Sequence, residues 1–153
     1  MKIIDFNRAK YGKKIGKFKV CELCNPENIK KQKCRKLSGE HWRVMVNKYP
    51  YMDGNVMIIP KEHIAKIEDL TKEQWEEFVS VLKKTKKTLS KIFKTEDFNI
   101  GLNLGKNAGG SLEHLHWQVI PRKFTPLNAS NIFADLYVVS VSPWELKKMI
   151  DKK

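Results

Sequence analysis

The sequence predicts a single α+β domain with a mainly antiparallel sheet of about five strands, one long helix and a short C-terminal helix. Two observations support this prediction. Short strand-like segments follow one another with only turns between them, and one long segment has helical periodicity. The length of 153 residues suits one domain with a buried core.

The first two strands are predicted on either side of a turn. Residues 42–47 and 55–59 have strand patterns, and Pro60 ends the second of them. Residues 49–54, which contain Pro50 and Gly54, form the turn. Two strands connected so closely are expected to pair in antiparallel fashion.

The long helix is predicted over residues 71–94. Thr71 and Gln74 match a capping box, which marks a helix start. Apolar residues then recur at helical spacing, and we expect them to face the core: Trp75, Phe78, Val79, Leu82, Leu89, Ile92 and Phe93. The opposite face is mostly lysine.

Three further strands and a helix are predicted after it. Residues 98–104, 114–120 and 136–141 have strand patterns, and a glycine-rich loop at 105–111 precedes the second of them. Pro143 opens a C-terminal helix, where proline is tolerated. At the other end, we expect an irregular arm or short helix over residues 1–20 and a loop over 21–40.

Composition excludes some classes of protein. Hydrophobic residues make up 41% and charged residues 31%, which does not fit a disordered chain. A run of about 18 apolar residues, as needed to span a membrane, does not occur. Residues 1–5 lack the pattern of a secretory signal, so we expect a cytoplasmic protein.

The net charge of +13 is concentrated near the N-terminus. Residues 1–36 contain twelve Lys and Arg against three Asp and Glu, a net +9. Such a surface attracts nucleotides, polyphosphates or nucleic acid, but a lysine-rich surface can also be merely solvated. Charge alone does not separate these alternatives.

The three cysteines cannot all pair with one another. Cys21 and Cys24 have C-x-x-C spacing, which in a cytosolic chain indicates a metal site or a redox pair rather than a structural disulfide. Cys34 is left over and is interpreted as an ordinary free cysteine.

Three polar residues are predicted to lie on one face of the strand at 114–120. Residues two apart on a strand point the same way, so His114, His116 and Gln118 would share a face. Two histidines and an amide make a poor core, which favours a functional site. The glycine-rich loop before them can bring backbone N–H groups and the Ser111 hydroxyl close to an anion. A neutral histidine nitrogen there could attack phosphorus and carry a nucleotidyl group.

Two segments of the chain resemble the histidine triad superfamily. The first runs from Trp42 through Tyr49-Pro50-Tyr51 to His63, and the second runs from Gly101 through His114-Leu115-His116-Trp117-Gln118 to Arg122. The resemblance implies one HIT-like domain over residues 1–153, with residues 1–40 as a basic arm carrying the C-x-x-C loop. It also implies a compact α+β subunit that forms a homodimer through its long helix and a strand.

The same resemblance implies roles for single residues. His116 would be the residue that becomes nucleotidylated, and Asn47 would lie near the ribose. The contacts to the phosphates would come from Asn103, Gly109, Gly110 and Ser111. Asn55 stands where many relatives carry a histidine, which leaves its role open.

The third position of the triad motif holds Gln118 instead of histidine. This H-x-H-x-Q version is similar to the branch of diadenosine tetraphosphate phosphorylases and galactose-1-phosphate uridylyltransferases. Glutamine can hold a phosphoryl group by hydrogen bonds but does not transfer protons as histidine does. The substitution favours transfer to phosphate or a sugar phosphate over hydrolysis, without excluding hydrolysis.

A zinc site is implied by the zinc-bearing members of the family, in which the first histidine of the motif is a ligand. Carried over to this chain, the ligands are Cys21, Cys24, His63 and His114. Four ligands complete a tetrahedral site, and thiolates suit zinc. The alternative is a pair of reduced cysteines and a His63 that only caps the following segment.

The function predicted is that of a nucleotidyl transferase or phosphorylase. It would act on dinucleoside polyphosphates such as diadenosine tetraphosphate through a covalent nucleotidyl-histidine. One alternative is a hydrolase of dinucleoside polyphosphates or nucleoside phosphoramidates. Another is a basic, zinc-stabilised nucleic-acid-binding module, which explains the charge and the C-x-x-C pair but not the polar residues after the glycine-rich loop.

Overall fold

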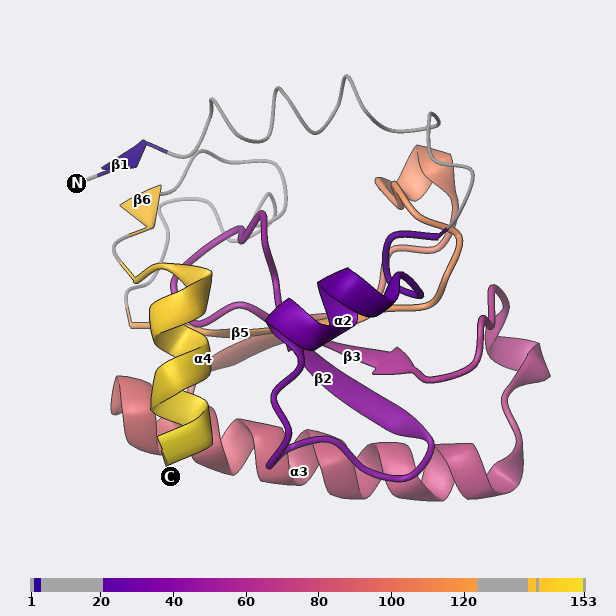
Figure 1. Ribbon diagram of the computed structural model, residues 1–153, viewed down its shortest axis with the longest axis horizontal. Coiled ribbons are helices and arrows are strands. Elements are labelled where there is room, and N and C mark those ends of the chain that lie inside the picture. Colours follow the sequence, from indigo (N-terminus) through magenta and orange to yellow (C-terminus); the bar gives the residue numbers. More distant parts are fainter. Residues whose placement is uncertain (1, 4–20, 124–137, 140, 153) are drawn as a thin grey trace.

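The fold is α+β, as predicted, and is built on a four-stranded antiparallel sheet. The computed structural model describes residues 2–3, 21–123, 138–139 and 141–152. The strand order is β2-β3-β5-β4, with the bounds β2 (Trp42–Val46), β3 (Val56–Pro60), β5 (Trp117–Pro121) and β4 (Phe98–Gly101). In Figure 1 the long helix α3 (Lys72–Phe93) runs along one side of this sheet, and α4 (Pro143–Lys152) descends toward it.

The sheet has fewer strands than the five or so expected. The segment predicted as the last strand contributes β6 (Val138–Val139), which pairs with β1 (Lys2–Ile3) in a separate two-stranded ladder. The edge strand β4 is also shorter than predicted and ends at Gly101. The rest of the arm predicted over residues 1–20 and the remainder of the strand predicted at 136–141 lie largely outside the described residues.

The sheet is covered on both faces. Every residue of β2, β3 and β5 is buried, and alternate side chains enter different cores. Residues facing α3 include Val44, Ile58 and Val119, whereas Met45, Met57 and Ile59 form a smaller cluster on the other face with Leu23. This second face is the one that carries the candidate site.

Helix α3 begins with the predicted capping box. The Thr71 hydroxyl oxygen accepts from the Gln74 backbone N–H at 3.3 Å, and the Gln74 side chain accepts from the Thr71 N–H at 2.9 Å. The pair satisfies N–H groups that have no partner inside the helix. The Trp42 indole N–H then donates to the Gln74 carbonyl at 2.6 Å, which joins the start of the helix to β2.

Two of the helix residues predicted in the core are instead exposed. Trp75 is 37% exposed and Val79 is 48% exposed. The two are one helical turn apart and lie beside the buried stripe that contains Phe78, Val81 and Leu89. Trp75 nevertheless packs edge-on against the core rings of Phe78 and Trp117, with centroids 5.8 Å apart in each pair, so it lies partly exposed at the rim of this core.

The region predicted as a loop at 21–40 contains a helix, α2 (Pro26–Gln32). Asn25 caps it by accepting from the N–H groups of Glu27 and Asn28 at 3.0 and 3.2 Å, and Pro26 takes the first position. The prediction was wrong because the helix has only 7 residues and shows no apolar period over so short a length.

Among the described residues, no helix has an apolar stretch long enough to cross a membrane.

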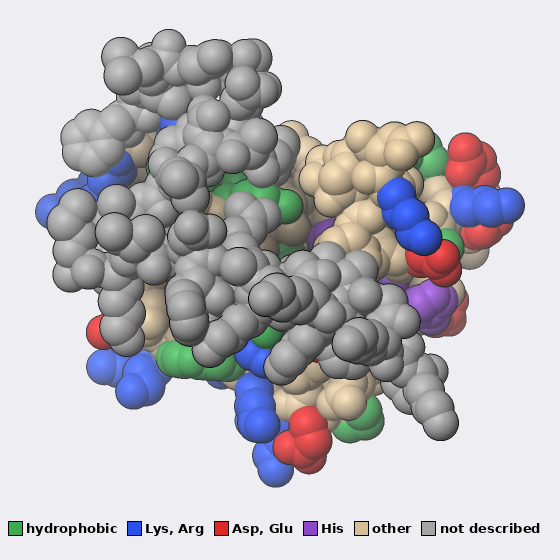
Figure 2. Space-filling model, turned by 90° about the horizontal axis from the view of Figure 1, so that it is seen from above, with side chains coloured by type: hydrophobic (Ala, Val, Ile, Leu, Met, Phe, Trp, Pro, Cys, Tyr) green, Lys and Arg blue, Asp and Glu red, His purple; other side chains and the backbone are tan. Residues whose placement is uncertain are grey.

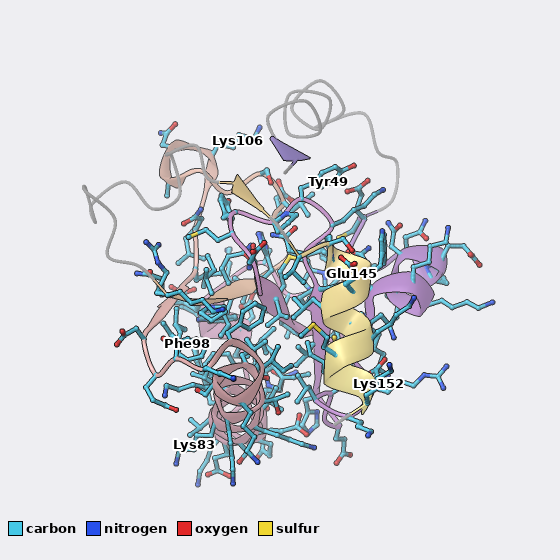
Figure 3. The ribbon with its side chains drawn as sticks, turned by 90° about the vertical axis from the view of Figure 1, so that its left-hand side faces the viewer. Tyr49, Lys83, Phe98, Lys106, Glu145 and Lys152 are labelled. Carbon is cyan, nitrogen blue, oxygen red and sulfur yellow. The ribbon has the colours of Figure 1, made fainter. Side chains whose placement is uncertain are left out.

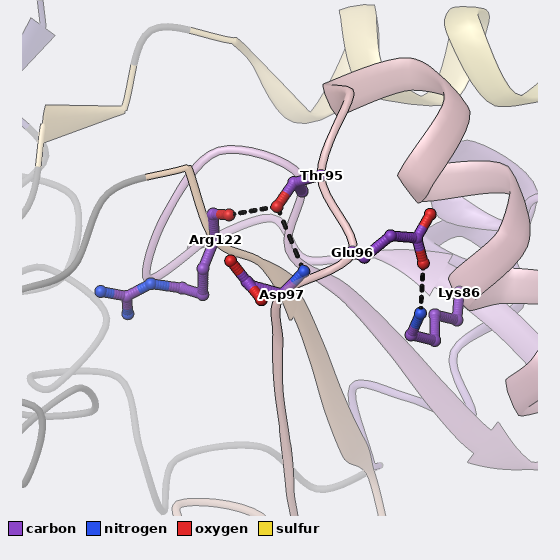
Figure 4. Close-up of polar contacts among 5 residues, drawn as sticks. All are labelled: Lys86, Thr95, Glu96, Asp97 and Arg122. Atoms are coloured by element: carbon purple, nitrogen blue, oxygen red, sulfur yellow. Dashed lines mark hydrogen bonds and ion pairs between the residues drawn. The ribbon is translucent and has the colours of Figure 1, made fainter.

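The connection from α3 to β4 is held against the end of β5 (Figure 4). The Thr95 hydroxyl donates to the Arg122 carbonyl at 2.5 Å and accepts from the Asp97 N–H at 3.2 Å. Lys86 on α3 forms an ion pair at 2.7 Å with Glu96 in this connection. These contacts fix where β4 enters the sheet, and thereby where the loop after it leads.

Candidate functional site

A cavity of about 280 Å³ lies on the face of the sheet opposite α3. Strand residues Met57 and Gln118 line it, and the walls come from four other segments. The wall residues are Glu22, Leu23, Asn28, Gln32, Asn47, Lys48, Tyr49, Tyr51, Gly109, Ser111, Leu112 and His116. Figure 3 shows Tyr49 and Lys106 at the opposite end of the molecule from Lys83 on α3. Seen from that end, histidine side chains are visible between the other surface groups (Figure 2).

His116 is buried beside this cavity in a defined tautomer. Its Nδ1 lies 2.8 Å from the carbonyl oxygen of His114, and only the ring nitrogen can be the donor in that pair. The proton is therefore on Nδ1 and the lone pair is on Nε2. Burial lowers the pKa of His116, against a smaller opposing effect of this hydrogen bond. A neutral imidazole with a free Nε2 lone pair is the form that can attack phosphorus.

The predicted common face of the histidines is not formed. The strand expected at 114–120 begins only at Trp117, so His114 and His116 precede it in irregular backbone. His116 and Gln118 both line the cavity, whereas the His114 side chain points to the two cysteines. The period of two residues applies only where the backbone is extended and paired.

Gln118 is held by two buried asparagines. Its Oε1 accepts from Asn55 Nδ2 at 2.8 Å and from Asn47 Nδ2 at 3.3 Å, and the Asn47 amide also donates to Asn55 Oδ1 at 2.9 Å. Because the oxygen of Gln118 is occupied in this way, its NH₂ group is left to donate to a group in the cavity. Asn55, whose role the sequence left open, therefore orients Gln118.

The same two asparagines shape the connection between β2 and β3. Asn47 Oδ1 accepts from the Tyr49 N–H at 2.9 Å, and Asn55 Oδ1 accepts from the Tyr51 N–H at 3.1 Å. These turns place both tyrosines at the cavity wall. Neither tyrosine was among the site residues predicted from the sequence, although their position in the Tyr-Pro-Tyr turn was a usable signal.

The glycine-rich loop places two of the residues predicted to contact phosphate at the cavity wall. Gly109 and Ser111 line the cavity, and Gly109 has φ +83°. The N–H of Gly110 donates to the Gly105 carbonyl at 2.9 Å inside the loop, and a Cβ on Gly110 would meet that oxygen at 2.9 Å. Gly110 is thus required for loop closure, and it lies outside the cavity lining, as does Asn103.

Cys21, Cys24, His63 and His114 form a cluster whose ligand atoms all lie within 4.8 Å of one another. Cys24 Sγ is 3.4 Å from His114 Nδ1 and 3.5 Å from His63 Nδ1, and Cys21 Sγ is 3.6 Å from His114 Nδ1. Zinc bonds of about 2.3 Å to sulfur and 2.0–2.1 Å to nitrogen give a tetrahedron with S···N edges of about 3.5 Å. The donor set therefore fits a four-coordinate metal ion.

The tautomer of His114 is also suited to a metal. His114 Nε2 lies 3.1 Å from the Pro60 carbonyl, so Nε2 carries the proton and Nδ1 faces the sulfur atoms with its lone pair. Burial, with a smaller contribution from His63, lowers the pKa of His114 to about 4. Burial and the adjacent Cys21 sulfur raise the pKa of the Cys24 thiol, whereas Arg43 lowers it.

The fold and the site define a compact α+β domain that presents a buried histidine to a cavity beside a glycine-rich loop. Residues 31–125 match the HIT domain, and the chain belongs to this family. The predicted family resemblance and fold class are confirmed.

Several known proteins are similar to this chain. An AP-4-A phosphorylase of Mycobacterium tuberculosis is 40% identical over 79 residues, which cover 51% of this chain and 40% of that protein. An asymmetrical bis(5'-nucleosyl)-tetraphosphatase of Schizosaccharomyces pombe is 32% identical over 78 residues, covering 51% of this chain and 43% of that protein. The chain thus spans less than half the length of these curated relatives. A solved structure of a Zn-bound histidine triad family protein from Mycobacterium smegmatis matches with a TM-score of 0.59 at 20% identity, covering 75% of this chain and 78% of that one.

Proposed function

We propose that this protein is a nucleotidyl transferase that cleaves dinucleoside polyphosphates such as diadenosine tetraphosphate through a covalent nucleotidyl-His116 intermediate. The observation that carries this proposal is the 2.8 Å hydrogen bond from His116 Nδ1 to the His114 carbonyl. It leaves the nucleophilic Nε2 of a buried, neutral imidazole at a cavity that also contains hydrogen-bond donors for a phosphate.

In the first step, Nε2 of His116 forms a bond to the α-phosphorus of one nucleotide unit. The bond from that phosphorus to the bridging oxygen breaks, and the remaining nucleoside polyphosphate leaves as an anion. The NH₂ group of Gln118 donates to a phosphoryl oxygen, with Ser111 as a further hydroxyl at the wall. In the second step, an acceptor oxygen attacks the same phosphorus, and the bond to Nε2 breaks.

The walls of the cavity suit a nucleoside. Leu23, Met57 and Leu112 supply apolar surface for a base, and Tyr49 and Tyr51 supply aromatic surface. Asn47, which the family resemblance places near the ribose, is also at this wall. Such walls favour a planar ring without distinguishing one base from another. The polyphosphate chain is therefore the part of the substrate that the site defines best.

The acceptor is proposed to be inorganic phosphate. Gln118 is anchored as a hydrogen-bond donor and cannot take a proton from water as a histidine could. The similarity to a protein named AP-4-A phosphorylase supports this choice, whereas the similarity to a tetraphosphatase supports water as the acceptor.

One assay separates the two acceptors. Diadenosine tetraphosphate is incubated with the protein with and without phosphate, and the nucleotides are separated by chromatography. Transfer to phosphate yields ADP and ATP, whereas transfer to water yields AMP and ATP. We expect ADP and ATP. AMP as the product in the presence of phosphate would make the protein a hydrolase, and the absence of any cleavage would overturn the proposal as a whole.

The cluster of Cys21, Cys24, His63 and His114 is proposed to bind zinc. The S···N distances of 3.4–3.6 Å support this, and so does the Zn-bound relative. Zinc held there would join the N-terminal segment and the His63 segment to the residue that positions His116. Elemental analysis is expected to find one zinc per chain, and metal-free protein with a native melting temperature and native activity would contradict the assignment.

A homodimer is proposed through α3 and the edge strand β4. Trp75 and Val79 on α3, and Ile100 on β4, expose 37%, 48% and 43% of their surface. Large apolar side chains gathered on one helix and on a sheet edge favour an interface over exposure to water. A second copy that covers them would also extend the sheet.

A further inference from the structure

Arg43 is a buried cation on the face of the sheet that carries the metal cluster. It lies in β2 next to Met45 on the same face and is only 8% exposed. In the described part of the chain, its guanidinium forms no ion pair with a carboxylate. A charge that is buried without a carboxylate needs another source of compensation.

The hydrogen bonds of Arg43 show where that compensation lies. Nη1 donates to the carbonyl of Leu23 at 3.2 Å, and Nη2 donates to the carbonyl of Lys61. Leu23 lies between the two cysteines of the C-x-x-C pair, and Lys61 lies two residues before His63. One rigid guanidinium fork therefore joins the two segments that supply three of the four cluster side chains.

The charge of Arg43 is also matched to this cluster. Burial lowers the pKa of Arg43, and the sulfur atoms of Cys24 and Cys21 oppose that shift. Thiols bind a metal only as thiolates, so metal binding places negative charge on the two sulfurs nearest this cation. Arg43 itself has no lone pair to offer and cannot be a ligand.

We infer that Arg43 is a positioning residue of the metal cluster, which sets the spacing of the two ligand segments and balances the charge of the cysteine sulfurs. This inference rests on the proposed metal site. Removing an outer residue that orients ligands in this way typically lowers the metal affinity about 10- to 100-fold.

The test compares three variants of the 153-residue chain in a zinc competition titration against a chromophoric chelator. Arg43→Met removes both the fork and the charge and is expected to weaken zinc binding by about 10- to 100-fold. Arg43→Lys keeps the charge but not the fork, and its affinity is expected to fall between those of Arg43→Met and the wild type. Arg122→Met is the matched control, because Arg122 is also a buried arginine but lies beside Thr95. The zinc affinity of this variant should equal that of the wild type.

The visible spectrum of bound cobalt(II) provides a second measurement, which a general loss of stability would not change. Its visible absorption reports tetrahedral thiolate and imidazole ligation, and we expect altered bands in Arg43→Met but not in Arg122→Met. Wild-type affinity and an unchanged cobalt spectrum in Arg43→Met would overturn the role of Arg43. If Arg43→Met does not fold, wild-type values in Arg43→Lys alone would overturn the role of the fork. A wild-type protein that binds no zinc would instead overturn the metal site, and this inference with it.

Discussion

Replacing Gln118 separates its catalytic contribution from its structural one. The Gln118 oxygen accepts from Asn55 and Asn47 at 2.8 and 3.3 Å, and its NH₂ group is the part that would reach a phosphate. Gln118→Glu keeps an acceptor for both asparagines but removes the donor and adds a negative charge. Loss of one preorganised donor to a developing charge lowers kcat by about 10²–10³-fold. We therefore expect at least this loss in Gln118→Glu.

Gln118→Met removes the acceptor as well. Two buried amide groups then lose a hydrogen-bond partner, at about 1–3 kcal/mol each, with the 3.3 Å bond contributing the smaller share. For a chain of this size, the melting temperature falls by about 2–4 °C for each kcal/mol lost. Gln118→Met should thus be clearly destabilised, and Gln118→Glu less so.

The measurements are the kcat of diadenosine tetraphosphate cleavage with saturating phosphate and the free energy of unfolding in urea. A Gln118→Glu variant with wild-type kcat would show that the NH₂ group does not contact the reacting phosphate. A Gln118→Met variant as stable as the wild type would show that the asparagine network does not depend on Gln118. The two results are independent, so the catalytic and the structural role of Gln118 are tested separately.

The other predictions concern three separate parts of the molecule. His116→Ala should abolish turnover and the covalent nucleotidyl adduct seen by mass spectrometry, while the melting temperature stays close to that of the wild type; retained turnover would refute the nucleophile. Burial raises the pKa of Cys34 to about 12, so this fully buried thiol should resist a thiol reagent at pH 8 until the protein unfolds. The same shift should lower stability as the pH rises above the ordinary thiol value of 9.0, because the unfolded thiol ionises while the folded one stays protonated. Val79→Glu combined with Ile100→Lys should convert a dimer into a monomer in light scattering, and a dimer that persists would place the interface elsewhere.

Local patterns were enough to predict most of the fold. The capping box at Thr71, the period of the long helix and the proline that opens α4 depend on residues a few positions apart, and the structure confirms each of them. Helix α2 was missed because its signal was confined to the Asn25 cap and Pro26, within a segment dominated by lysine. The exposure of Trp75 was missed because an apolar residue at the flank of a helix face fits the same period as one in the core.

The site depended on contacts that no local pattern contains. Cys21 and His114 are 93 positions apart, and only the family resemblance suggested that they meet. The position of Asn55 beside Asn47 could have been predicted from strand pairing, because the register that joins Val46 to Val56 continues to Asn47 and Asn55. The start of β5 could not be placed from the alternation of residues 114–118, since irregular backbone can carry the same alternation.

The irregular backbone before β5 allows two neighbouring histidines to serve two different sites. On a regular strand, His114 and His116 would face the same way, and both would enter the cavity. Here the His114 side chain joins the cysteines while its carbonyl accepts the Nδ1 proton of His116. The N–H of Leu115, between them, donates to the Ile64 carbonyl at 2.8 Å and ties this segment to the one that carries His63. The metal cluster and the nucleophile are therefore connected through the backbone of His114. A change that displaces His114 would also remove the hydrogen bond that keeps the proton of His116 on Nδ1, and nucleophilic attack depends on that tautomer.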